Sequence, residues 1–515
     1  MLRPERMGLQ AQNIYMKSKK NIMNIKKIYP AEWRKMHPDG MRADSDQYFA
    51  GIANSVAQIL AHSGIDDAFP DGEALRDAAM RLTGYFEDIC TGLGLWKTVV
   101  ATCQMRYGKP LPFHSTTEYY PGEPNLQDVQ LLLWDIIQST EPDRFINPEN
   151  PGIAFAAGDI YGIFDREYDD APDTPELVEY LHDPVMQNDF WQMRKRLEWI
   201  FMNSYIYLRG FFDFNDFLEE ISDSQYAEQQ AYINYLEHLF SDRHNLAMLT
   251  PPEWLAALSG QRIDIDTSLF ANRCYRIFKN EAETVRVRDL ANDNEISVEK
   301  YSFEERWINN LSLTGDGKDV FMGLVRYNDK YFQCGSLVEI PTGGLDGILE
   351  QVRQRDYQKS LMPSNEEAFY EASEGKPIVF LKGMNQLMEF YDKKMHVPLT
   401  GDYLKQMRDT VREQTDEGMM ALMATHDQGI LIITGYIPAI RHKNNPFYDP
   451  EYASSQGQGL LMDPMAVDYS AVCTMIDQGM LSDLALNSLK GHEYGHKLLQ
   501  DNIQYIADYM FAQHR

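Results

Sequence analysis

One short stretch near the end of the sequence has the residue types and spacing of a metal-dependent hydrolase site. It reads His492-Glu493-Tyr494-Gly495-His496, so two imidazoles stand four residues apart and a glutamate follows the first. On a helix, side chains at this spacing project from one face, one turn apart. In zinc peptidases with this spelling, the histidines hold the metal and the glutamate activates a water. The stretch therefore predicts, as one alternative, zinc ligands at His492 and His496 and a general base at Glu493.

A catalytic zinc needs a third protein ligand, and the sequence after the motif offers no glutamate for that role. Asn502 stands where a related pattern has its third histidine. The downstream candidates are Asp501, Asp508 and His514. A residue upstream in the chain is the other possibility, so the sequence leaves the third ligand unknown.

Helical periodicity gives the same two histidines a second interpretation. A helix over about Gly491 to Ala512 would place six residues on one stripe, at steps of four and three. The stripe contains His492, His496, Leu499, Ile503, Ile506 and Met510. Histidines on the inward face of an amphipathic helix are more often hydrogen-bonded core residues than ligands. The pattern favours a buried helix face over a metal site.

Three other motifs depart from the patterns they resemble. The segment 314–319 is similar to a phosphate loop, but Asp319 replaces the hydroxyl residue that would hold magnesium. The segment 213–216 is similar to a calcium loop without its central glycine. Nothing around Cys473 indicates an activated thiol that could work with a histidine. We interpret these as a turn, as core and as an ordinary thiol.

The elements that must position these residues change in character along the chain. From about His37 to Gly260, apolar residues recur at helical spacing and turn residues are concentrated between the runs. The predicted helices run from Ser45 to Ala61, from Leu75 toward Cys90, and over Leu126–Ile137, Asp183–Arg209 and Gln225–Phe240. This half of the protein is expected to be helical.

From about Ile263 to Pro341 the sequence instead alternates apolar and polar residues, as half-exposed strands do. The predicted strands are Thr284–Arg288, Ile296–Val298, Val320–Tyr327 and Tyr331–Ile340. Asn328-Asp329 between the last two predicts a tight hairpin turn. We expect an antiparallel sheet or small barrel of four to six strands.

From Gly343 onward, helices and short apolar runs alternate, with strands predicted at Pro377–Leu381 and Ile430–Thr434 and a loop from Arg441 to Leu460. The fold class is therefore α+β and multidomain: a helical N-terminal half, a central antiparallel β sheet or small barrel, and a mixed α/β C-terminal region. Because 515 residues exceed what one core organises, we expect domains at 37–262, 263–342 and 343–515.

Residues 1–36 are expected to form a basic tail outside these domains. They contain nine Lys or Arg against two Glu, which runs against the rest of the chain. An internal start at Met23 would make the first 22 residues an artefact of the reading frame. No apolar run of signal-peptide length follows.

Composition excludes several function classes. The formal net charge of −29 makes nucleic acid an unsuitable partner, because phosphate binding needs clustered Lys and Arg. The five cysteines are far apart and form no Cys-x-x-Cys, which indicates buried thiols in a reducing compartment. No stretch reaches the roughly 20 apolar residues of a membrane span. A cytoplasmic location without membrane contact is expected.

Several short segments carry a family resemblance. They are Tyr85–Asp88 with Gly94–Trp96, Tyr107–Phe113, Asn125–Asp128 leading to Trp134, Lys279–Thr284 and Asn444–Asp449. From about Ile28 onward the chain resembles an uncharacterised family of large acidic proteins from Bacteroidales-type bacteria, a domain of unknown function. The resemblance implies a cytoplasmic bacterial protein and brings no known activity, cofactor or catalytic residue.

Two functional hypotheses follow. The first is a non-catalytic protein, without a cofactor, that binds a protein partner through an acidic or groove-like surface. The alternative is a zinc-dependent hydrolase in which His492 and His496 are ligands and Glu493 is the base. Substrate, partner and oligomeric state are beyond the reach of the sequence.

Overall fold

The computed structural model describes residues 25–141, 144–207, 227–243, 246–270, 273–305, 307, 318–340, 349–350, 352–353, 365–396, 418–425, 429–464 and 466–512. The chain divides into two compact units. The first comprises Met1–Lys97, His114–Tyr180 and Asn203–Ile206, and the second comprises Thr98–Phe113, Leu181–Met202 and Tyr207–Arg515. The units interleave along the sequence, whereas the expected domains are continuous segments. Those domain boundaries stay predictions.

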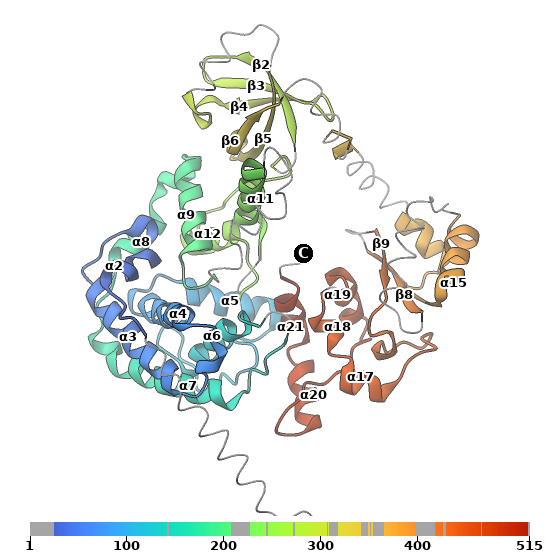
Figure 1. Ribbon diagram of the computed structural model, residues 1–515, viewed down its shortest axis with the longest axis horizontal. Helices are drawn as coiled ribbons and strands as arrows, with labels where there is room; N and C mark the ends of the chain where they lie inside the picture. Colours follow the sequence, from blue (N-terminus) through green and yellow to red (C-terminus); the bar gives the residue numbers. More distant parts are fainter. Residues whose placement is uncertain are drawn as a thin grey trace, which may run out of the picture. The chain divides into compact units, whose positions relative to one another are not determined.

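The first unit is helical. Its helices are α2 (Pro30–Trp33), α3 (Asp46–His62), α4 (Gly72–Thr91), α6 (Leu126–Gln138) and α7 (Pro151–Glu167), with 3₁₀ turns at Arg34–Met36, Pro38–Gly40, Asp66–Ala68 and Tyr168–Asp170 (Figure 1). Helices α5 (Leu95–Tyr107) and α8 (Pro175–His182) begin in this unit and end in the second. The expected helical N-terminal half is confirmed.

Helix α4 illustrates why these segments are helical. The Asp71 side chain accepts hydrogen bonds from the first free backbone N–H groups, and Gly92 ends the helix with φ +70°. Its buried face brings Phe86 against Phe164 of α7, with ring centroids 4.7 Å apart in a stacked arrangement. Phe49 of α3 meets the same Phe86 ring edge-on at 6.2 Å. These aromatic contacts join α3, α4 and α7 in one apolar core.

The second unit opens with helices. These are a 3₁₀ turn at Pro184–Gln187, α9 (Phe190–Met202), α11 (Ala227–Ser241) and α12 (Pro251–Ser259). The prediction of one helix from Asp183 to Arg209 is wrong in extent. Asp183 does cap the first turn through the Val185 N–H, but a turn at Asn188 separates it from α9. Arg209 lies outside the described residues.

A six-stranded sheet follows. Its strands are β1 (Ile265–Asp266), β2 (Cys274–Asn280), β3 (Thr284–Asp289), β4 (Glu295–Glu299), β5 (Lys318–Tyr327) and β6 (Lys330–Glu339). Their order is β1-β5-β2-β3-β4-β6, and β6 pairs back onto β5, so five strands close into a small barrel. The pairs are antiparallel except for β4–β6, a single parallel pairing of Val298 with Tyr331. The expected small barrel is confirmed.

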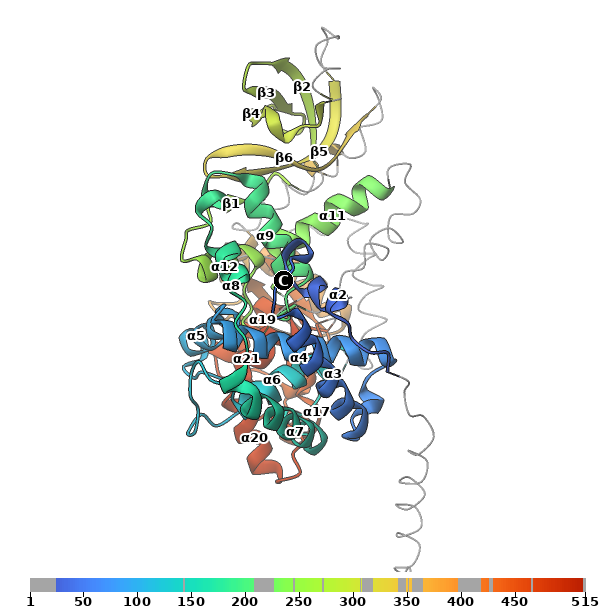
Figure 2. The same cartoon turned by 90° about the vertical axis from the view of Figure 1, so that its left-hand side faces the viewer.

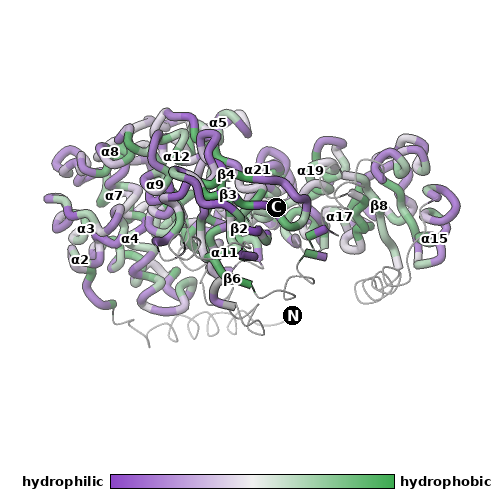
Figure 3. The backbone as a smooth tube through the Cα atoms, turned by 90° about the horizontal axis from the view of Figure 1, so that it is seen from above, coloured by the Kyte–Doolittle hydropathy of each residue, from purple (hydrophilic) through white to green (hydrophobic). Residues whose placement is uncertain are grey.

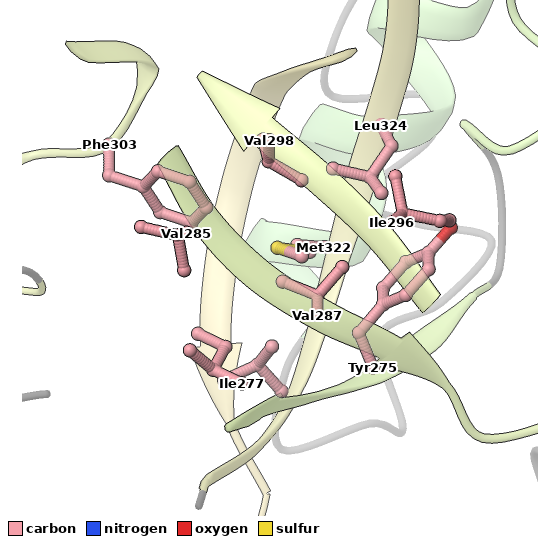
Figure 4. Packing of buried hydrophobic residues seen from close by; sticks show 10 residues of the cluster. Tyr275, Ile277, Val285, Val287, Ile296, Val298, Phe303, Met322 and Leu324 are labelled. Carbon is pink, nitrogen blue, oxygen red and sulfur yellow. The ribbon is translucent and has the colours of Figure 1, made fainter. Parts of the chain in front are cut away.

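Alternation along the strands fills the barrel interior. Val285 and Val287 of β3 point inward among Tyr275, Met322 and the other apolar residues of this core (Figure 4). The hairpin between β5 and β6 has positive φ at both Asn328 (+47°) and Asp329 (+62°), as a type I′ turn requires. The twist of that turn matches the strands it joins.

Strands β5 and β6 attach the barrel to the helices. Phe332 of β6 stacks on Phe190 of α9 at 4.6 Å, and the Tyr327 hydroxyl of β5 donates to the Met186 carbonyl at 2.6 Å. Helix α11 packs on β6 at Gly335, where an added Cβ would lie 3.2 Å from the Leu236 side chain. Strands β2, β3 and β4 lie on the opposite side of the barrel from α9 and α11 (Figure 2).

The C-terminal region contains a second sheet. Strands β7 (Ile378–Lys382), β8 (Met419–Thr425) and β9 (Gly429–Ile433) form an antiparallel sheet of order β7-β8-β9, followed after β7 by α15 (Gly383–Glu389) and a π-helical turn (Phe390–Met395). Strand β8 was not predicted as a strand. Its methionines Met420 and Met423 are buried, as packing residues would be, and the tube at β8 is coloured hydrophobic in Figure 3.

The last helices are α17 (Pro450–Gln456), α18 (Gly459–Met462), α19 (Tyr469–Asp477), α20 (His492–Gln500) and α21 (Ile503–Met510), after a 3₁₀ turn at Ile437–Ala439. The prediction of one helix from Gly491 to Ala512 is wrong, because the chain breaks at Asp501-Asn502. The predicted loop from Arg441 to Leu460 also contains α17, whose first N–H groups are capped by Asp449.

Candidate functional site

The two motif histidines occupy the start and the middle of helix α20. His492 is exposed, and its Nε2 lies 2.6 Å from the Ser454 hydroxyl of α17. His496 is half-buried and hydrogen-bonds through Nε2 to the Ser482 carbonyl at 2.9 Å, so that nitrogen carries the proton. The prediction that both histidines lie on a buried face is wrong for His492. Glu493 is exposed as well.

Gly495 has a packing role inside the motif. A Cβ at this position would lie 1.9 Å from the Leu486 carbonyl oxygen, closer than atoms can approach. The Leu486 N–H donates to the Gly495 carbonyl at 3.2 Å. Glycine at this position therefore allows the loop before α20 to run directly against the helix backbone.

The predicted third ligands lie in different surroundings. Asp501 is exposed at the end of α20. Asp508 is buried in α21 and accepts hydrogen bonds from Tyr107, Tyr469 and Gln504, each at 2.7 Å. His514 lies outside the described residues. Within the described ranges, no three His, Cys, Asp or Glu side chains are grouped so that they could hold a metal ion.

Asn502, at the break between α20 and α21, anchors a segment from far upstream. Its Oδ1 accepts from Lys109 Nζ at 2.5 Å and from the Phe113 N–H at 2.9 Å, and its amide donates to the Leu498 carbonyl. Burial lowers the pKa of Lys109. We call this set of contacts the Asn502 corner. Through these contacts the Tyr107–Phe113 segment binds the C-terminal helices.

A buried carboxyl centre lies in the first unit. The Asp128 carboxyl of α6 accepts from the Tyr85 hydroxyl at 2.8 Å, and Asn125 also donates to it. Asp88 of α4 accepts from the Tyr205 hydroxyl at 2.5 Å and caps α5 through backbone N–H groups of residues 94–96. Three segments that carry the family resemblance, Tyr85–Asp88, Gly94–Trp96 and Asn125–Asp128, therefore meet here.

Burial shifts the protonation of this centre. It raises the pKa of Asp128 to about 7, although the hydrogen bonds from Tyr85 and Asn125 favour the charged form. Burial also raises the pKa of Asp88. Asp135, further along α6, is different because it pairs with the buried Arg81 guanidinium at 3.1 Å. Perturbed carboxyls mark functional sites and buried structural networks alike, and these side chains are sealed from solvent.

A second buried polar chain lies beside it. His37 Nε2 lies 3.1 Å from Glu87, and Glu87 also accepts from Thr174, which bonds Ser45. Burial disfavours the charged imidazole, but the hydrogen bond and the charge of Glu87 outweigh it, so the pKa of His37 is raised. The chain fastens the segment before α3 to α4.

The exposed face of the barrel carries several cations and carboxylates side by side. We define the outward face as the side chains of β2, β3 and β4 that point away from the barrel interior, whether exposed or half-buried. Arg276 of β2 pairs with Asp319 through two hydrogen bonds of 2.7 and 2.9 Å. Glu295 of β4 accepts from both Arg286 and Arg288 of β3, at 2.9 and 2.7 Å, and these bonds lower its pKa. One carboxylate therefore serves two guanidinium groups.

Cations lie directly opposite each other between β2 and β3. Arg276 is the register partner of Arg288, and Lys279 is the register partner of Arg286. Like charges in directly opposed positions destabilise a sheet. The exposed Phe278 ring lies between these pairs in sequence, with the Arg288 guanidinium 5.2 Å from its centroid. These two successive pairs of like charge and the aromatic ring beside them form the candidate functional site.

Sequence reasoning missed this outward face. Alternation along Thr284–Arg288 placed its arginines on one side of a strand, but only the register places Arg276 opposite Arg288. The buried carboxyl centre was also missed, because its members come from four separate segments. The phosphate-loop and calcium-loop segments lie mostly or wholly outside the described residues. Cys473 is half-buried, and its sulfur accepts a hydrogen bond from the Gln504 amide at 3.7 Å.

No helix in the described ranges combines the length and the apolar character that crossing a bilayer requires.

Comparison with known proteins identifies one family. No curated protein matches the chain, and no solved structure does. A family model described as "Protein of unknown function (DUF3843)" matches residues 27–321 and 339–512. Because that match covers most of the chain, this protein belongs to the DUF3843 family of unknown function, as the resemblance of its short segments led us to expect.

Proposed function

We propose that this chain is a non-catalytic interaction protein and that the outward face of its barrel binds a protein partner. The observation that supports the proposal is the pairing of exposed Phe278 with Arg288 beside three further cations. Aromatic residues and arginine are enriched in the centres of protein interfaces. The opposite side of the barrel is already occupied by α9 and α11, which hold it in place.

The β-bulge in β2 strengthens this proposal. Ile277 pairs with Val287 and Lys279 pairs with Arg286, so Phe278 is an extra residue with no register partner in β3. Regular alternation would turn residue 279 into the barrel, but with the bulge both Phe278 and Lys279 face solvent. Bulges often redirect a side chain for function. An exposed aromatic ring produced by a bulge has no packing role in the barrel.

Site-specific photo-crosslinking tests the proposal. A photo-reactive residue at Ser297, exposed on β4 and opposite Arg286, should crosslink one dominant protein in cells. The same probe at exposed Glu374, in the turn before β7, is the control. Phe278→Ala should abolish the Ser297 product. Equal products from both positions, or products unchanged by Phe278→Ala, would contradict the proposal.

Metal analysis tests the non-catalytic part. The zinc alternative needs imidazole nitrogens of His492 and His496, and their Nε2 atoms are already hydrogen-bonded to Ser454 and to the Ser482 carbonyl. Protein purified without a metal-affinity tag should hold well under one zinc per chain. One zinc per chain, lost in His496→Ala and retained in a Ser454→Ala control, would contradict the proposal and favour the zinc alternative instead.

The five cysteines support a cytoplasmic location as part of the proposal. All five are thiols rather than disulfides, and burial raises the pKa of Cys103 and Cys274 to about 12. Thiols held in that state are unreactive and need no oxidising compartment.

A further inference from the structure

On the outward face, cations lie opposite each other without a carboxylate between them. Across β5, β2, β3 and β4 runs one row of register partners, Asp319, Arg276, Arg288 and Glu295. The two carboxylates occupy the ends of the row and the two guanidinium groups its centre. A stabilising pattern would alternate the signs, so the central pair is unfavourable as it stands.

The next row again places two cations opposite each other. Lys279 and Arg286 are opposed, Ser297 follows on β4, and the acidic neighbour Glu281 binds Lys279 from one side at 2.7 Å. The four cations of this face are thus paired with only three carboxylates, Asp319, Glu281 and Glu295. This group of cations contrasts with the net charge of −29 of the whole chain.

We infer that the partner segment bound by the outward face is acidic, and that its carboxylates bind between the two opposed cation pairs of β2 and β3. This inference rests on the function proposed above. Guanidinium forks match carboxylates in a bidentate geometry, as the Arg276–Asp319 pair already demonstrates within the chain. Phe278 offers the adjoining apolar contact.

A carboxylate-bearing polypeptide fits this face better than a nucleic acid. The four cations outnumber the carboxylates paired with them by only one, whereas binding a phosphate backbone needs many clustered cations. The overall negative charge would repel a polyanion at long range. A short acidic segment can pair with these cations without the charge density of a phosphate backbone.

The carboxylates already on this face allow a test that separates peptide binding from a purely structural role of the arginines. Glu295 binds Arg286 and Arg288, so it competes with an incoming carboxylate for the same donors. Removing its charge in Glu295→Gln should therefore raise affinity for an acidic segment. Removing a cation in Arg286→Gln should lower it.

Fluorescence anisotropy on the full chain tests the inference. The probe is a labelled ten-residue peptide that alternates Glu with apolar residues, and the matched peptide carries Gln in place of Glu. We expect the Glu peptide to bind more tightly, with roughly two- to five-fold weaker binding in Arg286→Gln and a gain of similar size in Glu295→Gln. Raising the salt concentration should weaken the binding.

Arg326→Gln is the control, because Arg326 is an arginine of the same barrel paired with Asp264, Asp266 and Asp329 at the other end of β5. It should leave the affinity unchanged, and thermal unfolding checks that each variant folds. Equal binding of the Glu and Gln peptides, or no gain in Glu295→Gln, would overturn the inference. Tighter binding of a ten-nucleotide single-stranded DNA than of the Glu peptide would overturn it too.

The two proposals fail differently. If the Ser297 crosslink forms and is lost in Phe278→Ala, but persists in Arg286→Gln at every salt concentration, the interaction function stands and the acidic partner is wrong. If Ser297 gives no specific crosslink, the interaction function itself fails.

Discussion

Helix α6 carries two aspartates whose surroundings give them opposite chemistry. Asp135 faces the buried guanidinium of Arg81 and is paired as an ion. Asp128 faces the Tyr85 hydroxyl and the Asn125 amide, which are neutral donors, and burial raises its pKa to about 7. The folded chain therefore holds a proton on Asp128 at pH values where the unfolded chain does not.

This difference predicts a pH dependence of stability. Because the folded pKa of Asp128 (about 7) exceeds 3.8, its stabilising contribution is complete below pH 3.8 and is lost as pH rises through 7. Asp128→Asn keeps the shape of the neutral side chain. Its free energy of unfolding relative to the wild type should therefore be about 3 kcal/mol higher at pH 8 than at pH 5. Urea unfolding at the two pH values measures it.

Asp135→Asn is the matched control on the same helix. It leaves the buried Arg81 without its carboxylate, so stability should fall by about 3 to 5 kcal/mol at both pH values. A gain in Asp128→Asn that is equal at pH 5 and pH 8 would show that Asp128 does not titrate in this range.

Gly495 gives a second prediction at the scale of one residue. Gly495→Ala places a Cβ against the Leu486 carbonyl oxygen and should lower the free energy of unfolding by about 2 to 3 kcal/mol. Thermal or urea unfolding of the purified variant measures the loss.

Gly162→Ala in helix α7 is the contrasting substitution, because, apart from its chain neighbours and the backbone of its own helix, no atom of the described residues lies within 4 Å of the Cβ it would add. It should stabilise the chain by about 0.5 to 1 kcal/mol through helix propensity. If both variants behaved alike, the close contact between α20 and Leu486 would be absent in solution.

At the scale of elements, the Asn502 corner joins three segments that are distant in sequence. Asn502→Ala removes the acceptor for Lys109 and for the Phe113 N–H and frees the Leu498 carbonyl. Unfolding free energy should fall by about 2 to 4 kcal/mol, with faster hydrogen exchange of the amides in residues 98–113.

Asn444→Ala, at an exposed loop position, is the control and should change neither quantity by more than about 0.5 kcal/mol. Exchange that accelerates across the whole chain in Asn502→Ala, with no excess at residues 98–113, would contradict a local anchoring role.

Long-range charge belongs to the scale of the whole molecule. A formal net charge of −29 repels itself in the compact state. Raising KCl from 0.01 to 0.15 M shortens the screening length from about 30 to about 8 Å. The melting temperature should rise over this range, because screening relieves the repulsion more than it weakens the paired charges on the surface. A fall in melting temperature would show that ion pairs dominate.

Several elements were predictable because their signals are local. Alternation and the Asn328-Asp329 turn located β3, β5 and β6, since side-chain period and turn type depend only on neighbouring residues. Strand β8 was missed because its run of methionine and alanine has weak strand preference, and its pairing with β7 and β9 fixes it. The final helix was over-extended because the break at Asn502 depends on partners near residue 110.

The sequence by itself determined the α+β composition, the helical front half, the central β-rich region and the family, and left open whether that region is an open sheet or a closed barrel. These follow from periodicity, turn residues and short segments that can be read in order along the chain. Tertiary structure alone decided which residues form a site. It brought Asp128 against Tyr85 rather than a cation, held His496 on a backbone carbonyl, and set Arg276 opposite Arg288. Protonation and charge pairing depend on distances across the fold, and spacing along one chain does not encode those distances.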